Sequence, residues 1–184
     1  DSDVYKRQGP FPSAVDQKAA IYNKTTIGGI THSYQFNDYL RHVISVFGSY
    51  TDFKNPFVTN YETRSEKNLG ARTYFSYENL EMENLQWEMQ LGAEGQKGWY
   101  DIKNYENNFG NKGDLNYDDH LENFQHFYFY RLKAKIAQRF IAEGSIGLNV
   151  NNIDFEQQAI NAAAMKDSKD FKNSWMPRLG LSYL

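Results

Sequence analysis

Residues 85–94 constrain the fold more than any other segment, because apolar and polar residues alternate there without a break. Alternation with a period of two is the pattern of a β-strand that has one apolar and one polar face. The polar face carries Glu88 and Glu94, and the apolar face carries Trp87 and Leu91. About ten residues is also the length that a tilted strand needs to cross a bilayer. The segment therefore predicts a membrane-spanning strand of a β-barrel.

The alternation recurs along the chain. It is clear in residues 69–78, 125–137 and 175–183, whereas 30–36 and 40–53 are weaker strand-like runs rich in Val, Ile, Phe and Tyr. Only Tyr74 is out of phase in 69–78, and the polar face of 125–137 carries three basic residues, which indicates contact with water. We expect an all-β, antiparallel up-and-down meander of about seven long strands.

Composition agrees with a barrel whose interior is polar. Mean hydropathy is −0.75, and no run approaches the roughly 18 apolar residues of a transmembrane helix. Aromatic residues make up 16% of the chain, with 14 Tyr and 13 Phe, as suits rings at lipid interfaces. The alternative is that these rings form the core of a soluble β-sandwich. Long alternating runs with one charged face favour the barrel.

Charge, cysteine content and histidine spacing disfavour several classes of function. The 20 basic and 23 acidic residues give a net charge of −3, without a basic patch for nucleic acid. Cysteine is absent, which excludes disulfides, thiolate catalysis and cysteine-based metal sites. The histidines are dispersed without metal-ligand spacing, and we interpret His120 as a solvated loop residue. We predict no metal site and no cofactor.

Catalytic residues are not expected either. Asp118, Asp119 and His120 are adjacent in sequence, so neighbouring side chains point to opposite faces of a strand or lie in a mobile loop rather than forming a triad. The sequence has no nucleophile elbow, phosphate-binding loop or zinc-binding helix motif. We predict that the protein is not an enzyme.

The first residues correspond to a DNA sequence that is used in sequencing libraries. Residues 3–8 are what the codons GAT GTG TAT AAG AGA CAG encode, and this string matches the transposon mosaic end of common sequencing-library adapters. We interpret residues 1–8 as adapter read-through and assign 9–184 to the barrel. An ordinary polar N-terminal segment is the alternative.

The connections alternate in length. Residues 37–39, 81–83 and 139–142 mark short reversals, whereas 53–64, 102–123 and 156–173 are long polar segments, the last with an Ala-rich stretch at 159–165 that could form one or two helical turns. Short turns at one end and long loops at the other are typical of outer-membrane barrels, whose long loops face outward. An open sheet edge in lipid leaves unpaired backbone groups. We therefore expect about seven strands to be part of a larger barrel.

A family resemblance rests on two runs. Residues 47–64 read FGSYTDFKNPFVTNYETR, and residues 68–73 read NLGART. They resemble the barrel of TonB-dependent outer-membrane receptors of the iron-complex type. In that family a strand runs into an outer loop with an Asn-Pro-Phe-x-Thr-Asn-Tyr-Glu-like sequence and returns as a Gly-Ala/Gly-Arg strand. The resemblance covers most of residues 19–184 in strand pattern and 50–73 as a motif.

The resemblance implies a fragment of a receptor in the outer membrane of a Gram-negative bacterium, for active uptake of a ferric siderophore or similar metal chelate. Its implied partners are outer-membrane lipid, the chelate, and the TonB energy-coupling complex acting through a plug domain that we expect outside residues 9–184. Rings and donors on outer loops would contact the chelate. The candidates are Tyr61, Arg64, Trp99, Tyr100, Tyr105 and Tyr117. The alternative is a β-protein without transport, either an adhesin-type barrel or a soluble carbohydrate-binding sandwich.

Overall fold

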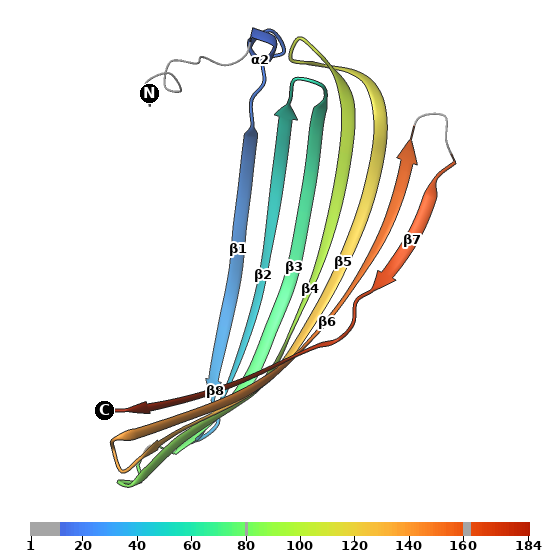
Figure 1. Ribbon diagram of the computed structural model, residues 1–184. Coiled ribbons are helices and arrows are strands. Elements are labelled where there is room, and N and C mark those ends of the chain that lie inside the picture. The colour runs from blue at the N-terminus through green and yellow to red at the C-terminus, as the bar shows by residue number, and fades with distance from the viewer. Residues whose placement is uncertain (1–11, 80, 160–162) are drawn as a thin grey trace, which may run out of the picture.

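The computed structural model describes residues 12–79, 81–159 and 163–184, and their main feature is one antiparallel β-sheet that follows a short helix, α2 (Pro12–Asp16) (Figure 1). Eight strands are found in this part of the chain. They are β1 (Tyr22–Gln35), β2 (Leu40–Pro56), β3 (Tyr61–Asn79), β4 (Leu85–Asn108), β5 (Asn111–Ile136), β6 (Phe140–Ala159), β7 (Met165–Asp170) and β8 (Ser174–Tyr183). Among the helical residues described, none belongs to a helix long and apolar enough to cross a membrane. The all-β antiparallel prediction is confirmed.

The meander is regular from β1 to β6 and changes at its end. β7 pairs with the upper part of β6, from Asn152 to Gln157, and β8 pairs with the lower part, from Phe140 to Asn149. Between them, the Phe171 amide donates to the Asn151 carbonyl at 3.0 Å, so the chain stays beside β6. β8 therefore pairs with β6 rather than with β7, its neighbour in sequence. Because β7 and β8 share one edge of β6, the eight strands occupy seven positions across the sheet.

The sheet is open. β1 lies at one edge and β7 with β8 at the other, and within the described residues these edges do not pair with each other (Figure 1). Unpaired strand edges in lipid leave amides and carbonyls without partners at a cost of several kcal/mol each. The open sheet is consistent with part of a larger barrel.

Short reversals lie at the lower end of the sheet, where the alternation pattern placed them. One turn joins β1 to β2, where Asn37 Oδ1 accepts from the amides of Tyr39 and Leu40, both at 2.9 Å. Another joins β5 to β6 through Ala137 and Gln138, both with positive φ. Two successive residues of positive φ match the right-handed twist of a hairpin. The short turns predicted at 37–39 and 81–83 are thus correct in position, whereas the one predicted at 139–142 lies earlier, at Ala137 and Gln138, because Phe140 already begins β6.

The three long outer loops predicted from sequence are wrong in kind. Residues 53–64 are largely the paired ends of β2 and β3, and residues 102–123 are largely the paired ends of β4 and β5. The turn between β4 and β5 is only Phe109 and Gly110, with φ of 54° and 85°. Residues 156–173 contain the end of β6 and all of β7. Of the Ala-rich stretch, Ala159 ends β6, residues 160–162 lie outside the described part, and no helix is found in the rest.

Pairing within the hairpins explains why these segments are strands rather than loops. Asn, Asp and Gly are depleted in strands, so their density suggests loops, but strand propensity is easily overridden by cross-strand hydrogen bonding. β4 and β5 have 24 and 26 residues, which at about 3.3 Å per residue gives a length of about 80 Å. A hydrocarbon core is only about 30 Å thick. Much of this hairpin therefore lies beyond the length that a bilayer can cover.

The two faces of the sheet differ in chemistry. The outer face, defined by Leu91 and the residues aligned with it, carries large exposed apolar side chains in the lower half of the sheet. They include Leu69, Phe75, Tyr77, Leu85, Leu91, Tyr128, Tyr130, Leu132, Ile136, Leu179 and Leu181. Further up the same face the residues become charged, at Lys67, Lys97 and Glu122. This apolar band is what a lipid-facing surface requires.

The opposite, inner face is polar and more closely packed. Ser76, at 1% exposure, donates to Glu88 Oε1 at 3.3 Å, and Arg131 forms a two-point ion pair with Glu143. Tyr74, the one ring out of phase with the alternation, lies on this face. Its ring on β3 is 6.4 Å from the Phe129 ring on β5, across the intervening strand β4. Side chains crowd together on the concave face of a curved sheet, and here Ser76 and Val43 are only 1% and 8% exposed, whereas Leu91 on the opposite face is 63% exposed. The inner face is therefore the concave one.

Candidate ligand-binding wall

A cluster of polar and aromatic residues lies on the inner face of β3, β4 and β5, above the apolar band. We call it the inner wall; it consists of Glu62, Arg64, Glu66, Asn68, Tyr100, Asn104, Tyr117 and Asp119. Strand register places it: Glu62 is aligned with Asn104, and Asn104 with Tyr117. Residues two apart along a strand share a face. The cluster therefore follows directly from the pairing of three long strands.

Arg64 is held between two carboxylates of its own strand. Its Nε donates to Glu62 Oε1 at 3.0 Å, and its Nη1 donates to Glu66 Oε1 at 3.4 Å. The guanidinium also lies 4.9 Å from the centre of the Phe53 ring. The hydrogen bond that Arg64 donates to Glu62 is the main cause that raises the pKa of Arg64, against a smaller opposing effect of burial. The charge of Arg64 is thus neutralised within the wall.

Two tyrosines line the same wall as protonated phenols. Tyr100 Oη donates to Asn68 Oδ1 at 3.0 Å, and burial, followed by the charge of Glu66, raises its pKa. Burial also raises the pKa of Tyr117, helped by the charges of Glu62 and Asp119. A phenol whose pKa lies above its ordinary value of 10.0 is neutral at physiological pH. Both hydroxyls therefore keep a proton to donate.

A β-bulge interrupts the wall beside Tyr117. Asn104 is aligned with Tyr117 and Tyr105 with Leu115, which leaves Asn116 without a partner position. Asn116 Nδ2 donates to Asn104 Oδ1 at 3.2 Å. Bulges re-aim side chains and are common next to functional sites. Here the bulge fixes the orientation of the Asn104 amide.

Two polar atoms of the wall lack partners within the described residues. Asn104 is only 3% exposed, yet its Nδ2 makes no hydrogen bond to any described residue. Asp119 Oδ1 is likewise unbonded, although Asp119 Oδ2 accepts from Gln157 Nε2 at 3.4 Å. Buried polar groups are nearly always hydrogen-bonded in native proteins, so each exception calls for an explanation. One buried donor and one buried acceptor of the wall are thus left without a partner among the described residues.

The structure divides the six residues expected to contact a ligand into two groups of three. Arg64, Tyr100 and Tyr117 come together on the inner wall. Tyr61, Trp99 and Tyr105 lie on the outer face of the same strands. All six are in strands, so the prediction that they lie on outer loops is wrong. The physical reason is the extended pairing of β2 with β3 and of β4 with β5.

The outer group has contacts of its own. Tyr61 and Tyr105 are aligned across β3 and β4, and Lys112 Nζ lies 5.9 Å and 4.8 Å from their ring centres. Trp99 has Lys97 Nζ at 5.3 Å from its ring. These are cation–π contacts, made by Lys112 of β5 to rings of β3 and β4 and by Lys97 to a ring of its own strand β4. They stabilise the hairpins from outside and do not reach the inner wall.

Sequence reasoning missed five residues of the wall: Glu62, Glu66, Asn68, Asn104 and Asp119. Residues 61–68 are polar on both faces, so this segment lacks the apolar half by which a half-buried strand is recognised. The shared face of these residues therefore became visible only in the paired hairpins.

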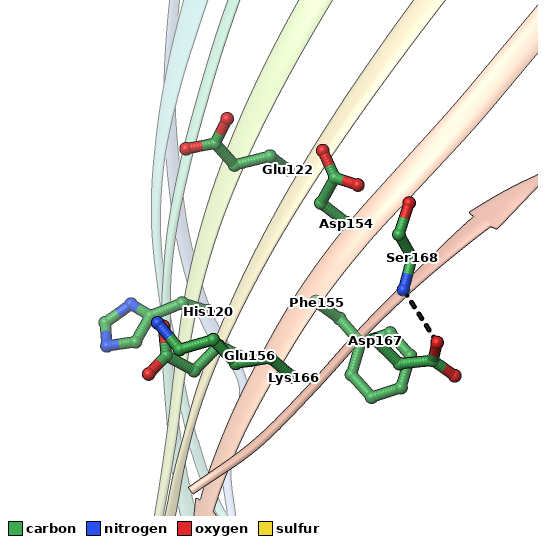
Figure 2. A pocket seen from close by; sticks show the side chains of 8 residues that line it. All are labelled: His120, Glu122, Asp154, Phe155, Glu156, Lys166, Asp167 and Ser168. Atoms are coloured by element: carbon green, nitrogen blue, oxygen red, sulfur yellow. Dashed lines mark hydrogen bonds and ion pairs between the residues drawn. The ribbon is translucent and has the colours of Figure 1, made fainter.

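Apart from the inner wall, a hollow lies between β5, β6 and β7, with a volume of about 550 Å³ (Figure 2). Its lining residues are His120, Glu122, Asp154, Phe155, Glu156, Lys166, Asp167 and Ser168. Most of them are exposed, and they pair with one another or with nearby carboxylates: Lys166 with Glu156 at 2.8 Å, and His120 Nδ1 with Asp101 Oδ1 at 2.6 Å. His120 is thus on a strand rather than on the expected loop. In residues 12–79, 81–159 and 163–184, no group of three or more His, Asp or Glu side chains is arranged to hold a metal ion.

Comparison by sequence identifies no relative. No protein-family model matches the sequence, and no curated protein matches it. The amino-acid sequence therefore does not by itself place the chain in a family.

Comparison by structure does find similar proteins. The ferric citrate transporter FecA in its unliganded form matches with a TM-score of 0.76 and 12% identity, over 90% of this chain and 26% of that one. The siderophore receptor PiuA from Acinetobacter baumannii matches with a TM-score of 0.69 and 8% identity, over 91% and 31%. The ferric yersiniabactin uptake receptor FyuA from Yersinia pestis matches with a TM-score of 0.63 and 8% identity, over 90% and 26%.

These likenesses concern the fold. The chain spans roughly a quarter to a third of the length of the solved structures that it matches. Identity between 8% and 12% is too low to carry function from one protein to another. The chain has the fold of part of the β-sheet in these receptors and transporters.

Proposed function

We propose that this chain is part of the barrel of a TonB-dependent outer-membrane receptor that actively takes up a ferric siderophore or a similar metal chelate. The observation that carries the proposal is the two-faced sheet, with an exposed apolar band around Leu91 and a polar concave face opposite. A soluble sandwich would cover such a band with a second sheet. The similarity in fold to three iron-chelate transporters and receptors supports the same proposal.

The long hairpins support an orientation for the chain. We infer that the end with short turns faces the periplasm and that the tips of the β2–β3 and β4–β5 hairpins face outward, as in outer-membrane barrels. The inner wall then lies at the outer mouth of the lumen, where an arriving chelate would first contact the receptor. Energy would come from the TonB complex through a plug domain encoded elsewhere in the complete gene.

The proposal assigns binding rather than catalysis to the inner wall. Tyr100 and Tyr117 present protonated phenols, and Asn104 presents an unbonded donor. Such groups bind a polar ligand by hydrogen bonds and ring contacts. We include Arg64 as a residue that shapes the wall, because its donors already engage two carboxylates.

The first experiment is recovery of the complete reading frame from the source DNA by long-read sequencing. We expect further barrel strands and an upstream plug domain, with a different sequence in place of residues 1–8. The gene would then be deleted in its host, and uptake of ⁵⁵Fe chelates measured under iron limitation. Uptake should fall in the deletion strain and should fail in the wild type when a protonophore collapses the membrane potential.

Two results would contradict the proposal. One is a complete frame that encodes no plug domain, which would favour an adhesin-type barrel. The other is a product recovered in the soluble fraction, which would favour a carbohydrate-binding sandwich. Fractionation with an outer-membrane marker protein controls for incomplete membrane extraction.

A further inference from the structure

We infer that the inner wall selects uncharged or cationic chelates of the hydroxamate kind and disfavours chelates with surplus negative charge, such as ferric carboxylates and catecholates. This inference rests on the proposed function and specifies its substrate class. It concerns the wall formed by β3, β4 and β5 and names the residues that set the preference.

The first step is the charge of the wall. Its ionisable side chains are three carboxylates, of Glu62, Glu66 and Asp119, and one guanidinium, of Arg64, which sum to −2. The guanidinium is engaged by Glu62 and Glu66. No basic side chain of the wall is left to attract an anion. Like charges repel, and a concave site of one sign strengthens this effect on an approaching ligand.

The second step is the pair of unsatisfied atoms. Asn104 Nδ2 is a buried donor without a partner in the described residues, and Asp119 Oδ1 is an acceptor in the same situation. Leaving such groups unbonded costs free energy that a ligand with matching atoms recovers. A ligand that reaches both atoms would therefore meet them with an acceptor and a donor. Hydroxamate chelates have carbonyl oxygens beside amide or amine N–H groups in their linkers.

The third step is the balance of charge in the ligand itself. Each hydroxamate group carries a single negative charge, so a ferric ion saturated by hydroxamates is neutral, and an amine in the linker makes it cationic. Catecholate and citrate complexes keep excess negative charge around the iron. The phenols of Tyr100 and Tyr117 stay protonated and add hydrogen bonds without adding charge. The wall thus matches the first class and repels the second.

The test uses the complete receptor purified in detergent and isothermal titration calorimetry with two probes, ferrioxamine B and ferric citrate. Ferrioxamine B is a cationic trihydroxamate and ferric citrate an anionic carboxylate complex. We expect ferrioxamine B to bind at least about tenfold more tightly, a difference of about 1.4 kcal/mol. Asn104→Ala should weaken ferrioxamine B several-fold and leave ferric citrate unchanged.

The decisive variant is the double substitution Glu62→Gln with Glu66→Gln, which removes two charges, keeps the side-chain shapes and frees Arg64. It should strengthen ferric citrate binding by about tenfold. Glu122→Gln, on the outer face of β5, removes a charge of the same sign and serves as the matched control, for which we expect no change. Heat-modifiable migration of each variant verifies that the barrel has folded.

The outcomes separate the two proposals. Tighter binding of ferric citrate by the wild type, or no gain in the double variant, overturns the charge preference and leaves uptake of metal chelates standing. Failure of both probes to bind, together with normal ⁵⁵Fe uptake in the deletion strain, overturns the proposed function and this inference with it.

Discussion

Arg72 of β3 lies over the Phe129 ring of β5, with its guanidinium 5.0 Å from the ring centre, across the intervening strand β4. The contact is possible because β4 has Gly92 aligned with Phe129, so that the ring covers a position without a side chain. The Arg72 side chain is also 3.8 Å from Glu94. Aromatic rings placed over glycines on neighbouring strands recur on the inner face, as at Phe47 and Gly70.

The first prediction concerns Gly92. A Cβ there would lie 2.5 Å from Phe129 Cζ and 2.6 Å from the Thr73 carbonyl oxygen, so Gly92→Ala should destabilise the barrel by about 1 to 3 kcal/mol through overpacking. Gly95 is the matched control, because a Cβ at that position meets nothing within 4 Å. Urea unfolding of the complete barrel in detergent measures the stability of Gly92→Ala and of Gly95→Ala. Equal midpoints for the two variants would contradict the packing described.

A second prediction tests the lipid-facing band. Leu91 is 63% exposed on the outer face, and Trp87 lies four residues away on the same face. Leu91→Asp and Trp87→Asp should each hinder membrane assembly, since a charge facing lipid is destabilising, by about 2 to 4 kcal/mol for Arg or Lys at the midplane and by less for Asp. Gln96→Asp, on the inner face of the same strand, should assemble normally. Normal insertion of both outer variants, judged by heat-modifiable migration, would exclude the assignment of this face to lipid.

A third prediction concerns Asn107, which is 8% exposed and ties the hairpin tips together. Its Nδ2 donates to the carbonyls of Gln17 and Phe57 at 2.9 Å and 2.6 Å, and its Oδ1 accepts from the Gly110 amide at 2.8 Å. Asn107→Ala should cost about 1 to 3 kcal/mol in local stability. Amide hydrogen exchange at Gly110 should accelerate, whereas the exposed Asn108→Ala should leave it unchanged. Unaltered exchange in Asn107→Ala would show that the tip is held by other contacts.

The fourth prediction uses pH. The pKa of Tyr117 is raised by burial and by the carboxylates Glu62 and Asp119. A raised pKa in the folded state means that the fold binds this proton more tightly than the unfolded chain does. The contribution to stability is therefore complete below the ordinary pKa of 10.0 and is lost as the pH rises through the folded-state pKa.

Phenolate absorbance provides the measurement. Tyr117→Phe should remove a late-titrating tyrosine from the alkaline titration and should flatten the fall of unfolding free energy above about pH 10. Tyr128→Phe, on the outer face, is the comparison for loss of a tyrosine hydroxyl outside the wall. A late-titrating step that persists in Tyr117→Phe and disappears in Tyr100→Phe would assign the effect to Tyr100 alone.

Much of the lower half of the sheet could be predicted from particular residues. The alternation through Trp87, Met89 and Leu91 predicts that these side chains share one face. In the structure they do, with Met89 aligned with Tyr77 and Leu91 with Phe75. Tyr74 was identified as the ring on the opposite face, where it packs near Phe129. A pattern with a period of two is a local property of the chain, so sequence is enough to read it.

The upper half could not be predicted in the same way. Residues 61–68 and 98–108 are polar on both faces, so the alternation that identifies a half-buried strand is missing. Their strand character comes from hydrogen bonds to partner residues up to about forty positions away, as between Tyr61 and Tyr105. Three of the six candidate residues, Arg64, Tyr100 and Tyr117, therefore share the wall, while Tyr61, Trp99 and Tyr105 lie behind it.

The sequence by itself determined the strand class, the apolar face and the short lower turns, because each depends on side chains within a few residues of one another. Tertiary structure decided the extent of the long hairpins, the return of β8 to β6, and the meeting of Glu62, Asn104 and Tyr117. Those features depend on register, and a shift of one residue would send every side chain to the opposite face. Register is set by the hydrogen-bond ladder and the bulge at Asn116, which exist only once the strands are paired.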